Sequence, residues 1–175
     1  AMGMYYILRD MPAKVDPLSP ASVITLMDSV VTGAPISGQS RINANAKSPF
    51  TGFIGDSQAG GFFPAELKFA GFDGIVIKGQ SPKPVYLTII DGEVALHDAS
   101  HLTGKTTGEV EEILKKETGQ PKAQIIQHGP AAERGVLFSS LVNMCSRNNG
   151  RNGMGLVMAS KGLRAIVVRG TKKMA

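Results

Sequence analysis

The sequence predicts an α+β fold built from two duplicated half-domains, with two related β-sheets and helices packed on them. Helical and strand patterns are mixed along the chain without the strict alternation of a doubly wound fold. Similar segments also recur in the same order about 90 residues apart, most clearly residues 69–79 and 160–170, where glycines and an Ile-Val pair coincide. We therefore expect a single domain over residues 1–175, duplicated over about 22–92 and 123–171. The alternative is that glycine–strand–glycine is only a common helix-to-strand connection.

Composition is that of a packed domain and excludes several classes of protein. Of the 175 residues, 42% are hydrophobic and 19% charged, so the chain can build a core. A single cysteine, Cys145, excludes a disulfide scaffold and a cysteine-ligated zinc or iron–sulfur site within this sequence. No apolar run approaches the roughly 20 residues of a membrane span, and the start of the chain lacks a secretory pattern. We expect a cytoplasmic protein.

The net charge of +5 and the pI of about 9.4 suggest an anionic ligand. Lysine and arginine are scattered singly, and aromatic residues do not interleave with them. This distribution favours a small polyanion held by a few arginines over nucleic acid.

The first half of the chain contains helix, strand and turn signals in alternation. Residues 62, 63, 67 and 70 are apolar at helical spacing, and Gly71 follows where a C-terminal glycine is typical. These patterns predict the end of a helix, two strands, a glycine-rich loop and a helix, at residues 4–11, 22–31, 41–46, 55–61 and 62–70 in that order.

The second half begins with a hairpin and ends with a strand. Asp91-Gly92 is a strong tight-turn signal, and Thr106 with Glu109 forms a capping box for a helix that ends before Gly119. We expect strands at 73–78, 84–90, 93–97, 123–127, 134–142 and 164–169, a second glycine-rich loop at 146–155, and a helix at about 153–161.

Two segments imitate nucleotide-binding motifs. Residues 99–106 end in Gly-Lys-Thr like a phosphate-binding P-loop, but alanine replaces the first glycine that the loop geometry needs. Residues 150–155 are a wrong permutation of the dinucleotide fingerprint. We interpret the first as a turn into a capped helix and do not expect a Rossmann fold.

No catalytic constellation is recognisable. The three histidines, His97, His101 and His128, lack metal-ligand spacing, and Cys145 has no adjacent activating base, so a structural thiol is favoured. Residues 146–153 combine two arginines, three asparagines and two glycines, which suits close approach of main chain and guanidinium groups to an anion. The alternative is a solvated surface loop. The residues by themselves therefore predict an anion or cofactor cradle without catalytic residues.

Several longer motifs follow one another along nearly the whole chain. They are Ser48-Pro49-Phe50-Thr51-Gly52-Phe53 and further motifs within residues 60–73, 83–86, 98–105, 129–133 and 150–163. In this order they resemble the N-terminal domain of tungsten-dependent aldehyde:ferredoxin oxidoreductases. In that family Gly104-Lys105 belongs to a motif that binds no nucleotide.

The resemblance implies a saddle of two related β-sheets that carries a bis-pterin cofactor. Tungsten, or molybdenum in some relatives, is held by dithiolene sulfurs in that family, and Mg²⁺ bridges the two pterin phosphates. By this resemblance Arg41 contacts one pterin and Arg147 the other, and the backbone carbonyls of Gln58 and Asn148 reach the Mg²⁺. The implied phosphate-lining residues are Gln58, Ala59 and Gly60 on one side and Asn148, Asn149, Gly150 and Arg151 on the other.

The implied function is that of a cofactor-binding domain. In the family the whole enzyme oxidises an aldehyde with water to a carboxylate and passes electrons through a 4Fe–4S cluster to ferredoxin. The metal centre performs the oxygen transfer, so we expect no catalytic residue in this chain and no activity of the chain alone. The expected partners are the C-terminal domains of the same enzyme, ferredoxin and a small aldehyde, with a homodimer as a further expectation for the full-length form.

The chain also departs from the family pattern. Position 58 is commonly asparagine and here is glutamine, while Asn148 and Asn149 replace small residues. The family's N-terminal hairpin is missing, as are the later helical domains with the cluster cysteines. We therefore expect a fragment or a split subunit. The alternative is a stand-alone domain that stores or inserts the pterin, or that binds another polyanion.

Overall fold

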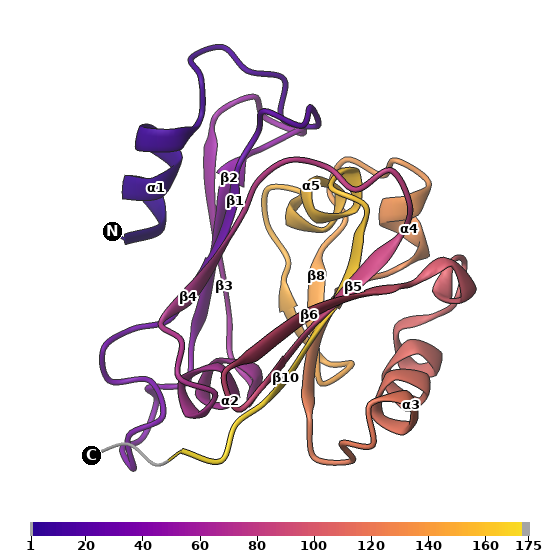
Figure 1. Cartoon of the computed structure of the whole chain (residues 1–175). Helices are drawn as coiled ribbons and strands as arrows, with labels where there is room; N and C mark the ends of the chain where they lie inside the picture. Colours follow the sequence, from indigo (N-terminus) through magenta and orange to yellow (C-terminus); the bar gives the residue numbers. More distant parts are fainter. Residues whose placement is uncertain (1, 173–175) are drawn as a thin grey trace.

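The computed structural model describes residues 2–172 and contains two β-sheets with helices on and between them (Figure 1). The first sheet has strand order β3-β2-β1-β4, and the second has strand order β6-β5-β10-β7-β8-β9. This mixed architecture confirms the predicted α+β fold with two sheets. The strands are β1 (Ile24–Met27), β2 (Ile42–Lys47), β3 (Ile54–Ala59), β4 (Gly74–Ile77), β5 (Val85–Ile90), β6 (Glu93–Asp98), β7 (Gln124–His128), β8 (Leu141–Asn143), β9 (Arg147–Asn149) and β10 (Leu163–Arg169).

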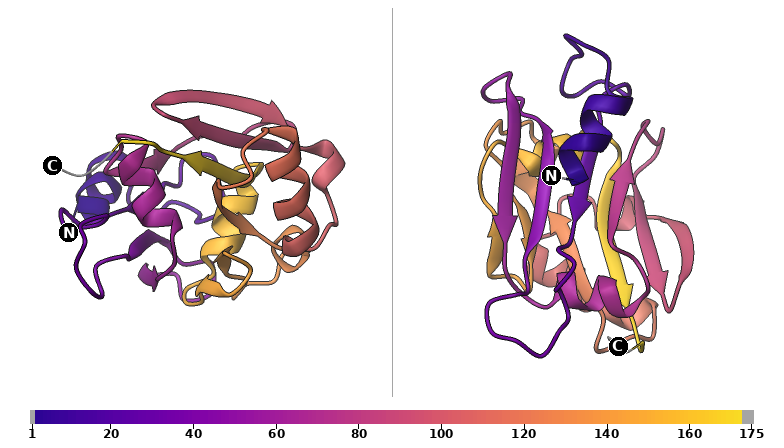
Figure 2. Two further views of the ribbon diagram at one scale, coloured as in Figure 1. Left: turned by 90° about the horizontal axis from the view of Figure 1, so that it is seen from below. Right: turned by 90° about the vertical axis from the view of Figure 1, so that its left-hand side faces the viewer.

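The helices are distributed over three layers. The helices are α1 (Met2–Asp10), α2 (Phe63–Phe69), α3 (Thr107–Glu117), α4 (Pro130–Glu133) and α5 (Met154–Ser160). Helix α1 covers the outer face of the first sheet, α3 covers the outer face of the second, and α2 and α5 lie between the sheets (Figures 1 and 2). Among residues 2–172, no helix is long and apolar enough to cross a membrane.

Two apolar cores hold these layers together. The larger one lies between the sheets, where Phe63 and Leu67 of α2 and Met154 of α5 are fully buried against strands of both sheets. The smaller one joins α3 to the second sheet through Val110 and Leu114. Burial of such side chains is the main favourable term in folding, so the inner core fixes how the two sheets face each other.

The two sheets repeat one antiparallel pattern. The order β3-β2-β1-β4 with α2 before β4 matches the order β9-β8-β7-β10 with α5 before β10. The ladders also agree in register. Gln58 of β3 lies opposite Asn43 of β2, and at the matching position of the second sheet Asn148 of β9 lies opposite Val142 of β8. Hairpin β5–β6 stands outside this pattern, since β5 pairs in parallel with β10 of the second sheet. The expected first repeat, residues 22–92, therefore includes one strand of the second sheet.

The structure corrects the expected loop at residues 55–61. Residues 54–59 form strand β3, with Asp56 and Gln58 exposed and Gly55, Ser57 and Ala59 buried. The inward residues of this strand are small and not strongly apolar, so the alternation that marks a strand was hidden. The second glycine-rich loop likewise contains the short strand β9.

The expected strand at residues 134–142 is also wrong over most of its length. Residues 130–133 form α4, and the N–H groups of Gly135 and Val136 turn back to the carbonyls of Ala132 and Ala131. The strand β8 begins only at Leu141. Arg134, the first residue of the expected strand, instead follows α4 as its C-cap.

The remaining predictions were accurate to within a few residues. The strand expected at 22–31 is limited to β1, whose ladder ends where Met27 meets Asn43 and Gly74. The hairpin turn at Asp91-Gly92 has positive φ at both residues, as a tight hairpin turn requires. Thr106 accepts from the Glu109 N–H, and the Glu109 side chain returns to the Thr106 N–H, which confirms the capping box.

Candidate functional site

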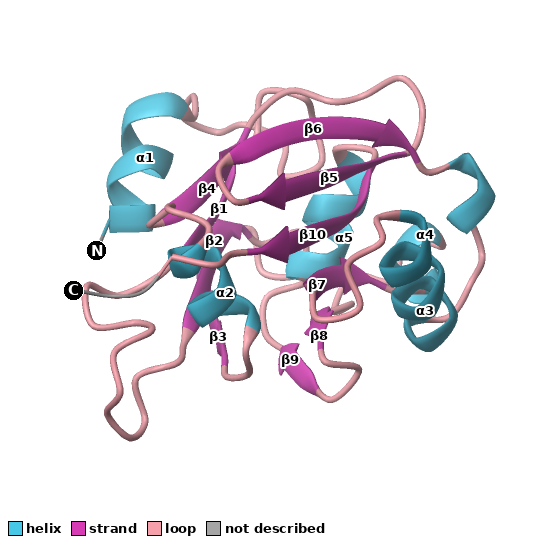
Figure 3. Ribbon diagram, turned by 60° about the horizontal axis from the view of Figure 1, so that its bottom comes forward, coloured by secondary structure: helices cyan, strands magenta, loops and turns pink. Residues whose placement is uncertain are grey.

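The edge strands β3 and β9 lie beside each other, and there the two sheets meet (Figure 3). We call this contact the seam and define it as residues 56–61 against residues 143–152. Asn149, which is fully buried in β9, donates from Nδ2 to the Ser57 carbonyl at 2.7 Å. Side chains therefore take the place of the backbone ladder that would otherwise join two strand edges.

Three asparagines of the second sheet cross the seam in the same way. Besides Asn149, Asn143 donates to the Gly60 carbonyl at 3.1 Å and Asn152 donates to the Asp56 carbonyl at 2.9 Å. Each bond joins a side-chain amide of residues 143–152 to a main-chain carbonyl of residues 56–60. The relative position of the two glycine-rich segments is thus set by hydrogen bonds.

An open groove of about 410 Å³ lies at one end of the seam. Arg41 reaches it from just before β2 and Arg147 from β9, so the two sheets each contribute one arginine. Both arginines are exposed, and neither forms a salt bridge with an acid within residues 2–172. Two uncompensated guanidinium groups in one groove suit an anion with several oxygen atoms. The groove is lined by Gly38, Gln39, Ser40, Arg41, Gly60, Gly61, Phe62, Met144 and Arg147.

Gly60 and Gly150 leave main chain uncovered beside this groove and the seam. The ladder registers place them at matching positions, one residue after Ala59 and Asn149. Neither has the left-handed backbone that demands glycine, and a Cβ on either would lie at least 3.7 Å from any neighbour. Packing and conformation therefore do not explain these glycines, whereas close approach of a ligand to the main chain would.

The structure brings the predicted site residues together but divides them by exposure. Gln58, Arg147, Asn148 and Arg151 are exposed at or beside the seam. Asn149 is different, because its buried amide is committed to the carbonyls of Ser57 and Ile42. Ala59 is also buried. The side chains of these two residues are therefore not available to a ligand.

Arg151 stands apart from the other two arginines. It does not line the groove, and its backbone N–H donates to the Ser57 hydroxyl at 3.1 Å. The carbonyls that accept across the seam belong to Ile42, Asp56, Ser57 and Gly60; those of Gln58 and Asn148 are not among these acceptors in the described chain.

Sequence reasoning missed Asn143. It lies in the short strand β8, is 1% exposed, and touches the groove-lining segments of both sheets. The signal that could have found it was a polar residue directly after the apolar pair Leu141 and Val142, with which the predicted strand ends, because a buried amide needs partners.

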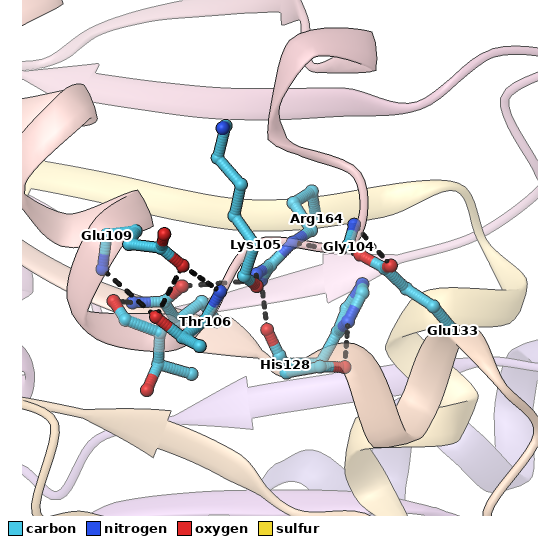
Figure 4. A network of polar contacts seen from close by, with 10 residues as sticks. Gly104, Lys105, Thr106, Glu109, His128, Glu133 and Arg164 are labelled. Atoms are coloured by element: carbon cyan, nitrogen blue, oxygen red, sulfur yellow. Dashed lines mark hydrogen bonds and ion pairs between the residues drawn. The ribbon is translucent and has the colours of Figure 1, made fainter.

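The segment that imitates a P-loop is occupied by internal contacts (Figure 4). The Gly104 N–H donates to the Glu133 carboxylate at 2.8 Å, and the Lys105 carbonyl accepts from Arg164 at 3.0 Å. Thr106 caps α3. An N–H that already holds a carboxylate is not free for a phosphate, which agrees with the interpretation as a turn into a capped helix.

The histidines and the cysteine do not converge on a second site. His97 contacts Thr88, His101 pairs with Glu117, and the His128 ring lies against the Gly129 carbonyl. Within residues 2–172 no three metal-binding side chains gather. Burial and the neighbouring Glu111 carboxylate raise the pKa of the Cys145 thiol, which disfavours the nucleophilic thiolate.

Fold and seam together define a class: an α+β domain of two matching sheets, joined along a polar seam that displays arginines and open main chain. Comparison with known proteins gives the family. The sequence model described as "Aldehyde ferredoxin oxidoreductase, N-terminal domain" matches residues 1–170. The chain belongs to this family, whose whole-length members are oxidoreductases.

The relatives include tungsten-containing aldehyde ferredoxin oxidoreductases of two archaea. The chain is 46% identical over 172 residues to that of Thermococcus kodakarensis and 44% identical over 171 residues to that of Pyrococcus furiosus. Each match covers 98% of this chain and 28% of the relative. The chain thus spans little more than a quarter of the length of these relatives, as their N-terminal portion.

Two more distant proteins share the domain. An aliphatic sulfonate oxidoreductase, WOR-like subunit, of Pyrococcus furiosus is 31% identical over 185 residues. In solved structures, the BamBC active-site complex of benzoyl coenzyme A reductase, with 1,5-dienoyl-CoA, contains a chain that superposes with a TM-score of 0.96 and 38% identity. That superposition covers 99% of this chain and 26% of the other, which confirms the fold.

Proposed function

We propose that this chain is the cofactor-binding domain of a tungsten or molybdenum oxidoreductase and that the seam holds its bis-pterin cofactor. The observation that carries the proposal is the matching geometry of the two sheets. Gln58 and Gly60 occupy the same ladder positions as Asn148 and Gly150, and one exposed arginine from each sheet enters a shared groove. A doubled site suits a ligand with two equivalent anionic ends.

The residues present fit such a group. Arg41 and Arg147 would hold the two pterins, and the main chain at Gln58–Gly60 and Asn148–Arg151 would line the two phosphates. The uncovered glycines leave room for that approach, and Asn143 and Asn149 hold the two segments in register. The carbonyls of Gln58 and Asn148 are the proposed Mg²⁺ ligands, since a hard cation prefers oxygen.

The chain's own part is to bind and orient. When bound, the metal centre supplies oxygen-transfer and electron chemistry. The arginines neutralise phosphate charge and fix the direction in which the cofactor faces the rest of the enzyme. Within residues 2–172 the groove lining includes two arginines but no carboxylate or imidazole to form an acid–base pair. In the whole protein we propose aldehyde oxidation to a carboxylate, with electrons passed through a 4Fe–4S cluster outside this chain to ferredoxin.

The test is the cofactor content of arginine variants of the full-length polypeptide. Arg147→Ala and Arg41→Ala are expected to lower tungsten and pterin per polypeptide several-fold, with little change in thermal unfolding, because exposed arginines add little to the core. Arg134→Ala is the matched control, since Arg134 is an exposed arginine outside the groove.

Metal analysis and pterin fluorescence report the outcome. Equal loss of cofactor in all three variants would contradict the assignment of Arg41 and Arg147, and absence of pterin from the unaltered protein would contradict the proposed function as a whole.

A further inference from the structure

One buried side chain touches both segments that line the groove. The amide Nδ2 of Asn143 donates to the Gly60 carbonyl of the first sheet at 3.1 Å and, at the longer distance of 3.5 Å, to the Arg147 carbonyl of its own sheet. Both acceptor residues line the groove. The amide therefore joins the main chain of the open glycine on one side to that of the groove arginine on the other.

The surroundings of Asn143 hold the amide in one position. Its Oδ1 is buried and finds no hydrogen-bond donor within residues 2–172. A Cβ placed on Gly61 would overlap this Oδ1, so the Gly61 main chain packs directly against the amide. The positive φ of Gly61, +108°, adds a conformational reason for glycine there. Rotation of the amide would break the bond to Gly60 without supplying a donor for Oδ1.

The sheet itself does not require an amide here. In the ladders Asn143 lies opposite Ile126 and Arg147, and its counterpart in the first sheet, opposite Leu26 and Ser57, is the fully buried Ala44. A buried acceptor without a donor also lowers stability. The first sheet has an alanine at the matching position, so the fold does not need the amide. Because the unpaired Oδ1 lowers stability, the amide must have a role other than stabilising the fold.

We propose that Asn143 is a positioning residue for the cofactor. Its bond across the seam sets the separation between the Gly60 main chain and Arg147, so that both sides of the groove meet one ligand without rearrangement. The inference rests on the proposed function of the seam. Groups that fix ligand-binding residues commonly affect binding as strongly as the binding residues themselves.

The first test compares two losses of a seam bond in the full-length polypeptide. Asn143→Ala copies the counterpart Ala44 and removes the donor. The matched control Asn152→Gly removes the bond to Asp56 outside the groove and suits the positive φ of 64° at that residue. Tungsten and pterin per folded polypeptide are expected to fall about tenfold in Asn143→Ala and less than twofold in the control. Similar cofactor content in both variants overturns the proposal.

The second test uses pH, which a purely structural role would not couple to cofactor retention. Asn143→Asp keeps the shape of the side chain, but an ionised carboxylate cannot donate to the Gly60 carbonyl. Burial raises the pKa of such a carboxyl, and its protonated form regains a donor. Retention relative to the unaltered protein is expected to recover from pH 8 to pH 5; a ratio independent of pH overturns the proposal. Unaltered protein without tungsten or pterin would instead refute the proposed function.

Discussion

The two sheets share a strand pattern but differ at two matching positions, where one has acidic residues and the other has basic residues. At the end of β1 the Asp28 N–H donates to the Asp73 carbonyl just before β4. The register of the second sheet places His128 and Arg164 at the corresponding points of β7 and β10. Two acids in one sheet thus stand where two bases stand in the other.

Each pair has adapted to its neighbours. Arg164 is 3% exposed, donates to the carbonyls of His128 and Lys105, and lies 3.2 Å from Glu133 (Figure 4). In the first sheet Asp73 is exposed and pairs with Lys68, while the buried Asp28 carboxyl finds no hydrogen-bond donor among residues 2–172. Backbone pairing preserves the sheet, and the side chains at its end are free to diverge as long as their charges are compensated locally.

The largest difference in unfolding free energy between the two sheet ends is expected when the side chains of Arg164 and Asp73 are removed in turn. Arg164→Ala leaves the carbonyls of His128 and Lys105 without this donor and removes the ion pair with Glu133, so denaturant unfolding should show a loss of about 3–5 kcal/mol. Asp73→Ala at the matching point of the first sheet should cost less than about 1 kcal/mol, because that ion pair is exposed. Equal losses would show that the two sheet ends are energetically alike.

A glycine pair sharpens the comparison further. A Cβ on Gly170 after β10 would overlap backbone atoms of Phe69 and Ala70, whereas Gly79 after β4 has nothing within 4 Å and a φ of +75°. Gly170→Ala is therefore expected to cost about 2–3 kcal/mol or more through overpacking, and Gly79→Ala about 1–2 kcal/mol through strain alone. Thermal unfolding of both variants measures the order, and a larger loss for Gly79→Ala would reverse it.

The pH dependence of stability should have opposite signs at the two sheet ends. At the end of the second sheet it comes from His128. Burial, reinforced by the Arg164 charge, lowers the pKa of His128 to about 4. In the unfolded chain the histidine pKa is about 6.5, so between about pH 4 and pH 6.5 the unfolded chain binds more protons than the folded chain. His128 therefore lowers stability as the pH falls from about 6.5 to 4, by roughly 1–3 kcal/mol. Unfolding of His128→Gln and the unaltered protein between pH 7 and pH 4 isolates the contribution, and parallel curves would refute it.

Asp28 should act in the other direction. Burial raises the pKa of its carboxyl to about 8. Because the folded state then holds the proton above the unfolded pKa of about 3.9, the Asp28 contribution to stability declines as the pH rises from about 4 to 8. Asn has no charge to bury, so Asp28→Asn should stabilise the protein at pH 7 by roughly 2–4 kcal/mol. The gain should vanish near pH 4, and a gain that is constant with pH would contradict the ionisation.

Local sequence signals predicted those elements whose reasons lie within a few residues. The capping box of Thr106 and Glu109 and the Asp91-Gly92 turn are examples, since the same hydrogen bonds and φ values form wherever these residues meet. The strand β3 escaped prediction because its inward residues, Gly55, Ser57 and Ala59, are small. They are small because a second strand edge lies against them, and that neighbour is 90 residues away.

The sequence by itself determined the α+β class, the family, and the concentration of glycine and arginine in two segments. Only the tertiary structure decided which of those residues face a ligand and which hold the seam. Asn148 and Asn149 are neighbours of identical chemistry, yet one is exposed and the other is buried in bonds to the opposite sheet. The physical reason is the strand period of two, which turns adjacent side chains to opposite faces, together with the packing of α2 and α5 that brings the two sheet edges into contact.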